Sequence, residues 1–243
     1  MSAIYFISDI HLGLQDEKIE QLKLEKIERL FAIVKAEGCS LYMLGDILDY
    51  WMEFHHVIPK GFTRFFCLLS DLVRHNIKVV YVAGNHDFYL GRFFDDELGI
   101  KTTCGMHELR LDGRKFVIAH GDGLGKGDLG YKLIASFIRN RFSISLLSSI
   151  HPDLAVAIMK GLSQLSRAHK PVNIVFETDR LLNFAESLAA EKEFDYFVCG
   201  HNHVKGVTEL STGTSRYVNL GTWIDGSSPY GVFKNGIFQL MEL

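Results

Sequence analysis

Five short polar motifs carry the groups in this chain that could do chemistry, and each directly follows an apolar run. In chain order they are SDIH (8–11), GD (45–46), GNHD (84–87), HGD (120–122) and GHNH (200–203). In the first and last motifs two polar side chains stand two residues apart, which projects both to the same side of an extended segment. Carboxylate, imidazole and amide oxygen together suit divalent ions such as Mn²⁺, Zn²⁺ or Fe²⁺.

The motifs supply seven candidate metal ligands, which are Asp9, His11, Asp46, Asn85, His120, His201 and His203. Seven ligands exceed the four of one tetrahedral ion and fit two ions about 3.5–4 Å apart that share a carboxylate. Asp46 lies between the two groups of ligands in the sequence and is the natural bridge. The set contains no cysteine, which argues against a structural zinc site. Each motif alone has an ordinary structural explanation as a turn, cap or buried histidine, but the five together favour a site.

The elements that must position these motifs can be read from the apolar runs. AIYFIS (3–8), LYML (41–44) and KVVYVA (78–83) predict buried strands. Helical spacing over 17–37 ends at Gly38, and a second helical pattern runs from Phe62 to Val73. Alternating strands and helices predict an α/β sheet with parallel pairs, and ligands gather outside the carboxyl ends of such strands.

The second half of the chain shows a different pattern. HELRLD and RKFVIAH flank Gly113 and predict a hairpin, a helix is expected over about 174–192, and DYFVCG (195–200) and four later short runs predict strands. Residues 129–169 are helical in pattern, apolar and basic, and we interpret them as a cap inserted into a single domain that spans 1–243.

Composition excludes some functional classes. The chain has 243 residues, a formal net charge of −3 and 47% hydrophobic residues, so nothing global favours nucleic acid. Four well-separated cysteines are typical of a reducing compartment. The sequence predicts neither a signal peptide nor a membrane span. We therefore expect a cytoplasmic protein, with peripheral contact at the inner membrane as the alternative.

The order of the motifs from Asp9 to His203 resembles the calcineurin-like metallophosphoesterases. The resemblance implies a four-layer α/β/β/α sandwich with a dimetal site, most often Mn²⁺, with Zn²⁺ or Fe²⁺ as alternatives. It implies that one ion is held by Asp9, His11, Asp46 and His203, and the other by Asp46, Asn85, His120 and His201. It also implies that His86 is catalytic and that Asp87 orients it through a hydrogen bond.

Within the family, three segments resemble the enzymes that hydrolyse UDP-2,3-diacylglucosamine to UMP and 2,3-diacylglucosamine 1-phosphate in lipid A biosynthesis. They are GDILDYW, GNHDFYLG and HGDGLGKGDLGY, the last followed by a helical cap pattern. The sequence departs from well-known members in one place, since they carry arginine where His86 stands. The resemblance implies a lipid-linked nucleotide sugar as partner at the cytosolic membrane face. The implied substrate contacts are Asn85, His86, Asp128, Tyr131, Ser166, Arg167, Lys170 and His201.

Alternatives remain at three points. Tyr50, Trp51 and Phe54 are interpreted as core residues, although they could instead wall the site, as could Trp223. The cap is either an ordinary helical pair or an apolar chamber for acyl chains with basic groups for phosphates. The substrate could be another phosphodiester, a nucleotide or a phosphoprotein, and a non-catalytic scaffold that kept the fold is the remaining hypothesis.

Overall fold

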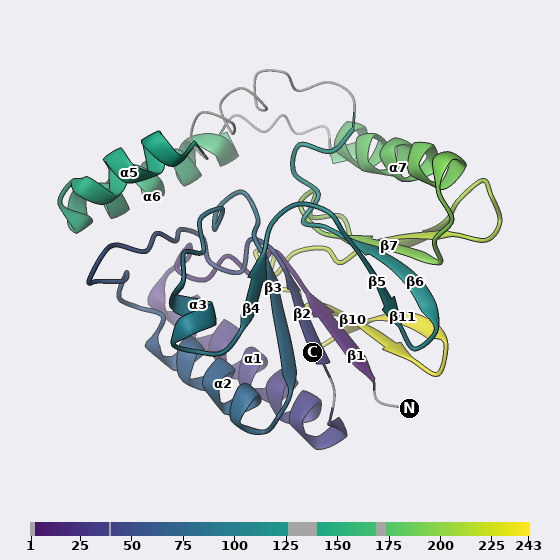
Figure 1. Cartoon of the computed structure of the whole chain (residues 1–243), viewed down its shortest axis with the longest axis horizontal. Coiled ribbons are helices and arrows are strands. Elements are labelled where there is room, and N and C mark those ends of the chain that lie inside the picture. The colour runs from purple at the N-terminus through teal and green to yellow at the C-terminus, as the bar shows by residue number, and fades with distance from the viewer. Residues whose placement is uncertain (1–2, 39, 126–139, 169–173) are drawn as a thin grey trace.

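The computed structural model describes residues 3–38, 40–125, 140–168 and 174–243, which form two β-sheets flanked by helices (Figure 1). The first sheet has the strand order β11-β10-β1-β2-β3-β4. Its strands are β1 (Ile4–Ile7), β2 (Ser40–Leu44), β3 (Lys78–Val82), β4 (Lys101–Thr103), β10 (Pro229–Lys234) and β11 (Ile237–Glu242). The second sheet has the order β5-β6-β7-β9-β8. Its strands are β5 (His107–Leu111), β6 (Arg114–Ile118), β7 (Tyr196–Cys199), β8 (Gly206–Glu209) and β9 (Arg216–Asn219).

The helices of the described part cover the outer faces of the sheets and the edge where several strands end. They are α1 (Glu17–Glu37), α2 (Thr63–Arg74), α3 (Phe93–Asp96), α5 (Arg141–Ser149), α6 (Pro152–Ala168) and α7 (Ile174–Glu191). In Figure 1, α1 and α2 lie beneath the first sheet and α7 lies beyond the second. No described helix is long and apolar enough to cross a membrane.

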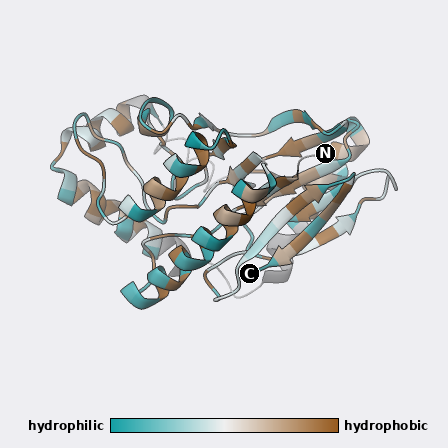
Figure 2. Cartoon of the chain, turned by 90° about the horizontal axis from the view of Figure 1, so that it is seen from below, coloured by the Kyte–Doolittle hydropathy of each residue, from teal (hydrophilic) through white to brown (hydrophobic). Residues whose placement is uncertain are grey.

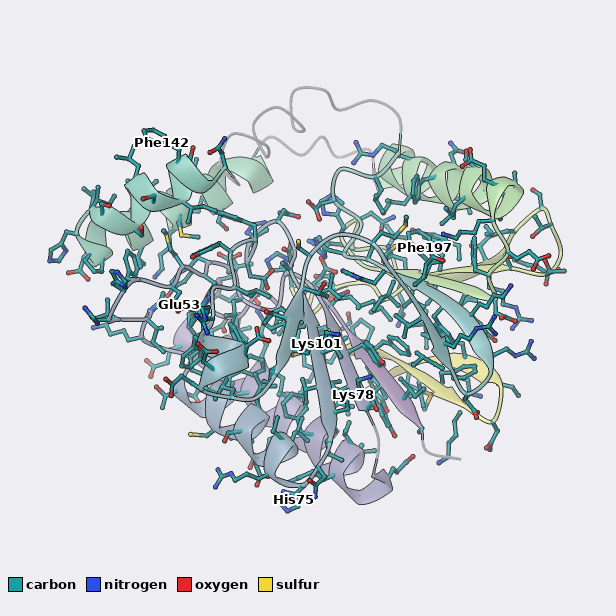
Figure 3. All side chains as sticks on the ribbon, in the orientation of Figure 1. Glu53, His75, Lys78, Lys101, Phe142 and Phe197 are labelled. Atoms are coloured by element: carbon teal, nitrogen blue, oxygen red, sulfur yellow. The ribbon has the colours of Figure 1, made fainter. Side chains whose placement is uncertain are left out.

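Three apolar clusters separate four layers, which confirms the predicted sandwich. Alternate residues of β1 face opposite ways: Tyr5 packs in the cluster under α1 and α2, and Phe6 in the cluster between the sheets. There the rings of Phe6 and Phe116 stack with centroids 5.9 Å apart. Phe197, labelled in Figure 3, packs in the third cluster, against Phe184 of α7. The central strand β1 is buried throughout and the edge strand β8 is mostly exposed, and in Figure 2 strands and helices alike carry both colours.

Parallel pairing gives the sheets a common edge. β1 through β4 run parallel, in a register that aligns Tyr5 with Leu41 and Leu41 with Val79. β6, β7 and β9 are likewise parallel, whereas β5 pairs antiparallel to β6, as the hairpin prediction required. The carboxyl ends of parallel strands meet at one edge, so the polar motifs that follow them are brought together.

Most of the predicted elements are confirmed. α1 begins after Asp16, whose side chain accepts a hydrogen bond from the Ile19 N–H, and ends at Gly38 in the left-handed conformation (φ 62°). Trp51 is fully buried and its indole N–H donates to the Leu90 carbonyl, which places it in the core as we interpreted it. The short elements α3 and β4 were not predicted.

Helices α5 and α6 lie within residues 129–169, the segment that we interpreted as a cap. In Figure 1 they lie on the side where β2 and β3 end. Ala155 and Met159 of α6 are buried in the same apolar cluster as α1 and α2, and Ile144 of α5 packs against that cluster. The helical pair is therefore docked on the body of the protein through apolar contacts.

Candidate active site

The five motifs follow five strands of the two sheets, at the carboxyl ends of β1, β2, β3, β6 and β7. Backbone hydrogen bonds fasten neighbouring motifs together beyond the strands. The Asp9 N–H donates to the Gly45 carbonyl (3.1 Å), the His11 N–H to the Asp46 carbonyl (2.9 Å), and the Gly200 N–H to the His120 carbonyl (2.8 Å). The backbone of the site is thus an extension of the sheets and not a set of independent loops.

Five of the seven candidate ligands have a left-handed backbone. The φ angles are 51° at Asp9, 50° at His11, 53° at Asp46, 73° at His201 and 62° at His203. A residue with a side chain rarely adopts this conformation, which costs roughly 1–2 kcal/mol per residue. Such strain gathers where a structure must aim side chains at a common point. It is the backbone signature expected of a preorganised site.

Glycines beside the ligands leave room that a side chain would fill. A Cβ on Gly45 (φ 81°) would lie 2.6 Å from His120 Nδ1 and 2.7 Å from the Gly84 Cα. A Cβ on Gly84 would overlap Asp46, and one on Gly200 would overlap Asp9. The absence of these side chains therefore lets the two carboxylates and His120 approach one another.

Around Asp9 and Asp46 the candidate ligand atoms come within a few ångströms of one another. His11 Nε2 lies 3.6 Å from Asp46 Oδ2 and 4.0 Å from Asp9 Oδ1, and His203 Nε2 lies 3.2 Å from Asp9 Oδ1. His11 Nε2 is buried and has no hydrogen-bond partner among the residues that the structure describes. An orphaned imidazole nitrogen that faces two carboxylates is an arrangement that a cation would complete.

His120 and Asn85 approach Asp46 from the other side. His120 Nδ1 lies 2.9 Å from the Leu44 carbonyl, which can only accept, so Nδ1 carries a proton and Nε2 is turned to the site. Nε2 lies 3.4 Å from Asp46 Oδ2 and 3.1 Å from Asn85 Oδ1. Carboxylate, amide oxygen and imidazole nitrogen therefore converge, and the carbonyl behind the ring fixes the tautomer that a metal ligand needs.

His201 completes the set from β7. Its backbone N–H donates to both carboxylate oxygens of Asp9, at 3.2 Å and 3.0 Å, and its ring centroid lies 5.1 Å from that of His120. Among the residues that the structure describes, three groups of side chains have ligand atoms within 4.8 Å of one another: Asp9, His11 and His203; His11, Asp46 and His86; Asp9, Asp46 and His120. With Asn85 beside His120 and His201 beside Asp9, the structure brings all seven predicted ligands and the predicted catalytic residue His86 to one place.

Charge balance at the site depends on the buried histidines. Burial raises the pKa of the Asp46 carboxyl, but the charges of His120 and His86 outweigh burial and hold that pKa well below its usual range. Burial also raises the pKa of the Asp9 carboxyl. Other effects, of which the hydrogen bond with His203 is the largest, outweigh burial and lower that pKa below its usual range. Burial lowers the pKa of His120, but the Asp46 carboxylate raises it to about 10. In the protein without a metal, protonated His120 therefore neutralises part of the buried negative charge.

The donor set fits divalent metal ions. The buried carboxylates of Asp9 and Asp46 lie together, His11 Nε2 and His120 Nε2 both face Asp46, and Asn85 Oδ1 lies beside His120 Nε2. Buried carboxylates need positive charge close by, and a divalent ion would supply it in place of the proton on His120. Oxygen and imidazole donors without thiolate suit Mn²⁺, Zn²⁺ and Fe²⁺ alike.

Metal binding should therefore release a proton. Because the pKa of His120 is about 10 without metal, its Nε2 is protonated at pH 7.5 and must lose that proton to bind an ion. We expect release of about one proton and an apparent Mn²⁺ affinity that rises up to about tenfold per pH unit from pH 6.5 to 9. Calorimetric Mn²⁺ titrations in two buffers of different ionisation enthalpy measure this, with His56→Ala, an exposed histidine, as control. Titrations without proton release at pH 7.5 would contradict the prediction.

Protonation of His120 also makes the stability of the metal-free protein depend on pH. The folded-state pKa of His120 lies above its ordinary value of 6.5. The stabilisation from its protonation is therefore complete below pH 6.5 and is lost as the pH rises through about 10.

Asp87 does not have the role that we predicted. Its carboxylate accepts hydrogen bonds from the backbone N–H groups of Asp46 (3.1 Å), Ile47 (2.9 Å) and Gly84 (2.7 Å), and from the Tyr81 hydroxyl. It therefore braces the turn that carries Asp46 and does not orient His86. His86 and Asp87 are adjacent in GNHD, but the Asp87 carboxylate is turned to the backbone of residues 46–48 and of Gly84.

Asp49 contacts both His86 and His11, which sequence analysis did not foresee. His86 Nδ1 lies 3.1 Å from the Asp49 carbonyl, and His11 Nδ1 lies 3.1 Å from the Asp49 carboxylate. Lys23 is a second unforeseen neighbour, since its buried ammonium group donates to the His11 carbonyl. The acidic position in GDILDYW was a signal for Asp49, whereas nothing in the sequence pointed to Lys23.

The predicted substrate contacts divide into two groups. Asn85, His86 and His201 lie in the site. Asp128, Tyr131 and Lys170 lie outside the described residues, as do the side chains of Ser166 and Arg167 in α6.

Comparison with known proteins agrees with this geometry. The family model described as calcineurin-like phosphoesterase matches residues 2–205. A Porphyromonas gingivalis protein named UDP-2,3-diacylglucosamine hydrolase is 30% identical over 258 residues, covering 100% of this chain and 98% of the relative. A Yersinia pseudotuberculosis protein of the same name is 28% identical over 228 residues, covering 91% and 92%.

Among solved structures, an archaeal phosphodiesterase superimposes with a TM-score of 0.51 at 14% identity, over 99% of both chains, and supports the fold alone. The buried carboxylates and histidines at the strand ends and the match over residues 2–205 lead to one conclusion. The chain belongs to the calcineurin-like phosphoesterase family.

Proposed function

We propose that this protein is a metal-dependent pyrophosphatase that hydrolyses UDP-2,3-diacylglucosamine to UMP and 2,3-diacylglucosamine 1-phosphate, a step of lipid A biosynthesis. The observation that carries the proposal is the similarity to the Porphyromonas gingivalis hydrolase, which covers the whole chain. It therefore includes α5 and α6 as well as the strand ends that any phosphoesterase of the family needs. In the reaction one P–O bond of the anhydride breaks and water supplies the new oxygen on phosphorus.

The seven donors are proposed to hold two ions. Asp9, His11 and His203 would bind one ion and Asn85, His120 and His201 the other, with Asp46 shared. Mn²⁺ is the proposed metal, and Zn²⁺ or Fe²⁺ are the alternatives. When bound, such a pair binds phosphoryl oxygens and lowers the pKa of a water to about 7. Asp46, with Oδ1 held by the His86 N–H (2.9 Å), presents Oδ2 toward His11 and His120.

His86 is proposed as the catalytic side chain. Because Nδ1 faces the Asp49 carbonyl, which only accepts, Nδ1 carries a proton and Nε2 is the atom presented to the site, 4.0 Å from Asp46 Oδ2. A proton on Nε2 could be given to the leaving oxygen, or its charge could stabilise the negative charge that develops on the phosphoryl group. Burial of the ring fixes this direction, since the side chain is 7% exposed.

The α5–α6 pair is proposed to accommodate the acyl chains and to meet the membrane surface from the cytosolic side. Its outer side carries exposed apolar side chains, and Phe142 of α5 is 76% exposed and projects away from the body of the protein (Figure 3). The others are Leu146, Leu154, Ile158 and Leu162. A two-chain lipid substrate resides in a bilayer, and an apolar surface beside the site would let the protein approach it. Asp128, Tyr131, Ser166, Arg167 and Lys170 remain proposed contacts for the sugar and phosphates.

Membrane contact can be tested by removing two of these side chains. The double variant Phe142→Ser and Leu146→Ser should bind phospholipid vesicles at least about tenfold more weakly, because each buried apolar side chain contributes roughly 1.5–3 kcal/mol. The measurement is co-sedimentation with anionic vesicles. The control is Val207→Ser with Ile237→Ser, which removes two exposed apolar side chains (44% and 58% exposed) from β8 and β11. Equal loss in both double variants would contradict the prediction.

The function is tested by direct substrate competition. UMP release from UDP-2,3-diacylglucosamine in detergent micelles with Mn²⁺ is compared with turnover of UDP-glucose, bis(p-nitrophenyl) phosphate and a phosphopeptide. We expect kcat/KM for the lipid substrate to exceed the others by about 10²-fold or more, since a lipid-binding surface contributes only there. Preferred turnover of a soluble substrate would identify a different phosphoesterase. Absence of all turnover in protein that binds Mn²⁺ would favour the scaffold hypothesis.

A further inference from the structure

Asp49 joins the site to helix α6 through one buried carboxylate. The residue is 3% exposed, and its two oxygens have different partners. Oδ1 lies 3.1 Å from His11 Nδ1, and Oδ2 accepts a hydrogen bond from the Ser163 hydroxyl at 2.9 Å. A side chain of the main body thus contacts both a proposed metal ligand and the helical pair that is docked above it.

Ser163 lies on the docked face of α6. Ala155, Met159 and Ser163 follow one another at intervals of four residues, which places them on one side of the helix, and all three are buried. Next to them, the Lys160 ammonium group lies 4.6 Å from the centroid of the Tyr50 ring. The Ser163 hydroxyl is therefore held where α6 meets the segment that contains Asp49 and Tyr50, so its hydrogen bond depends on that docking.

The other partner of Asp49 is the imidazole ring of His11, whose orientation decides which nitrogen faces the site. With Nδ1 against a carboxylate oxygen, His11 carries its proton on Nδ1 and turns the Nε2 lone pair toward Asp46 and Asp9. Carboxylates behind ligating histidines fix both tautomer and ring orientation, and their loss typically weakens metal binding 10- to 100-fold. The backbone of Asp49 is fixed as well, because its N–H donates to the Leu12 carbonyl at 2.9 Å.

We infer that Asp49 is a positioning residue through which the docking of α6 is coupled to the orientation of His11. The Ser163 hydroxyl donates to Oδ2 while Oδ1 is directed at His11, so loss of that hydroxyl removes a contact that restrains the orientation of the carboxylate. The carbonyl of the same residue holds His86 Nδ1, so the link reaches both histidines. The inference rests on the proposed function only in assigning His11 to a metal ion.

The test is a double-mutant cycle of Ser163→Ala and Asp49→Asn, with Mn²⁺ affinity measured by electron paramagnetic resonance of the free ion. Ser163→Ala should weaken Mn²⁺ binding about fivefold, the effect expected from the loss of one hydrogen bond. Asp49→Asn should weaken Mn²⁺ binding about tenfold or more. The double variant should bind like Asp49→Asn alone, because the serine acts only through the carboxylate. Ser149→Ala is the matched control, since its hydroxyl on α5 bonds only the Ser145 carbonyl (2.7 Å) among described residues.

A second readout reports on the ring itself. Nitrogen-15 NMR of the metal-free protein should show His11 with its proton on Nδ1 in the wild type and a mixture of tautomers in both single variants. Neither measurement uses a substrate, so both test the inference whether or not the protein hydrolyses UDP-2,3-diacylglucosamine. Wild-type Mn²⁺ affinity and an unchanged His11 tautomer in Ser163→Ala would overturn it, as would effects that multiply in the double variant.

Discussion

Replacing Asp46 with alanine should abolish binding of at least one Mn²⁺ and lower turnover more than about 10³-fold. Asp46 is the group that both halves of the site share, since its Oδ2 lies 3.6 Å from His11 Nε2 and 3.4 Å from His120 Nε2. Losing a single preorganised electrostatic contact typically costs 10²- to 10³-fold in turnover. Loss of a shared ligand removes more, because it disturbs both ions and the water that they would activate. Bound metal per chain and kcat measure the two effects.

A conservative variant separates the loss of charge from damage to the fold. Asp46→Asn keeps an oxygen that can accept from the His86 N–H (2.9 Å), so its metal-free form should still fold, with a free energy of unfolding lowered by the lost attraction to protonated His120. It should still lose bound Mn²⁺, because a neutral amide is a weak bridge between cations. Asp96→Ala removes an exposed carboxylate of α3 and should change neither quantity. Full metal content in Asp46→Asn would contradict the bridging assignment.

The sequence predicted the strand ends well because the signals there are local. An apolar run followed by Gly-Asp or Gly-Asn requires a buried strand that stops abruptly, and β2 and β3 do end at Leu44 and Val82. Parallel pairing then places the motifs on one edge without further information. The seven candidate ligands were found in this way, since each is tied to a strand and not to a long loop.

What the sequence did not predict depends on contacts across the fold. The hydrogen bond between Asp49 and Ser163 joins residues 114 positions apart, and no spacing rule relates them. Asp87 was assigned to its neighbour His86, but the fold turns its carboxylate to the backbone of residues 46–48 instead. Nor did the sequence reveal the left-handed backbone at Asp9 or Asp46, because this strain is imposed by the pairing of neighbouring motifs.

Replacing His86 with alanine should lower kcat by about 10²- to 10⁴-fold, the usual contribution of a positioned acid or base, while metal content stays near the wild-type value. The Asp49 carbonyl directs the His86 ring at the site, whereas the backbone N–H of His86 donates the hydrogen bond to Asp46. That hydrogen bond survives the substitution, so the proposed bridge is left in place. The measurements are kcat and bound Mn²⁺, with His56→Ala as the exposed-histidine control. Unchanged kcat would reject the catalytic role.

The His86→Arg variant then decides between the two roles proposed for the imidazole. Arginine offers a permanent positive charge and several donors, but it does not release a proton near neutral pH. If His86 acts by stabilising developing negative charge, His86→Arg should recover most of the kcat lost in His86→Ala. If His86 protonates the leaving oxygen, the arginine variant should be as slow as the alanine variant on the natural anhydride. It should then approach wild-type kcat only on substrates whose leaving group needs no proton, such as p-nitrophenyl esters, because there the missing acid is no longer required.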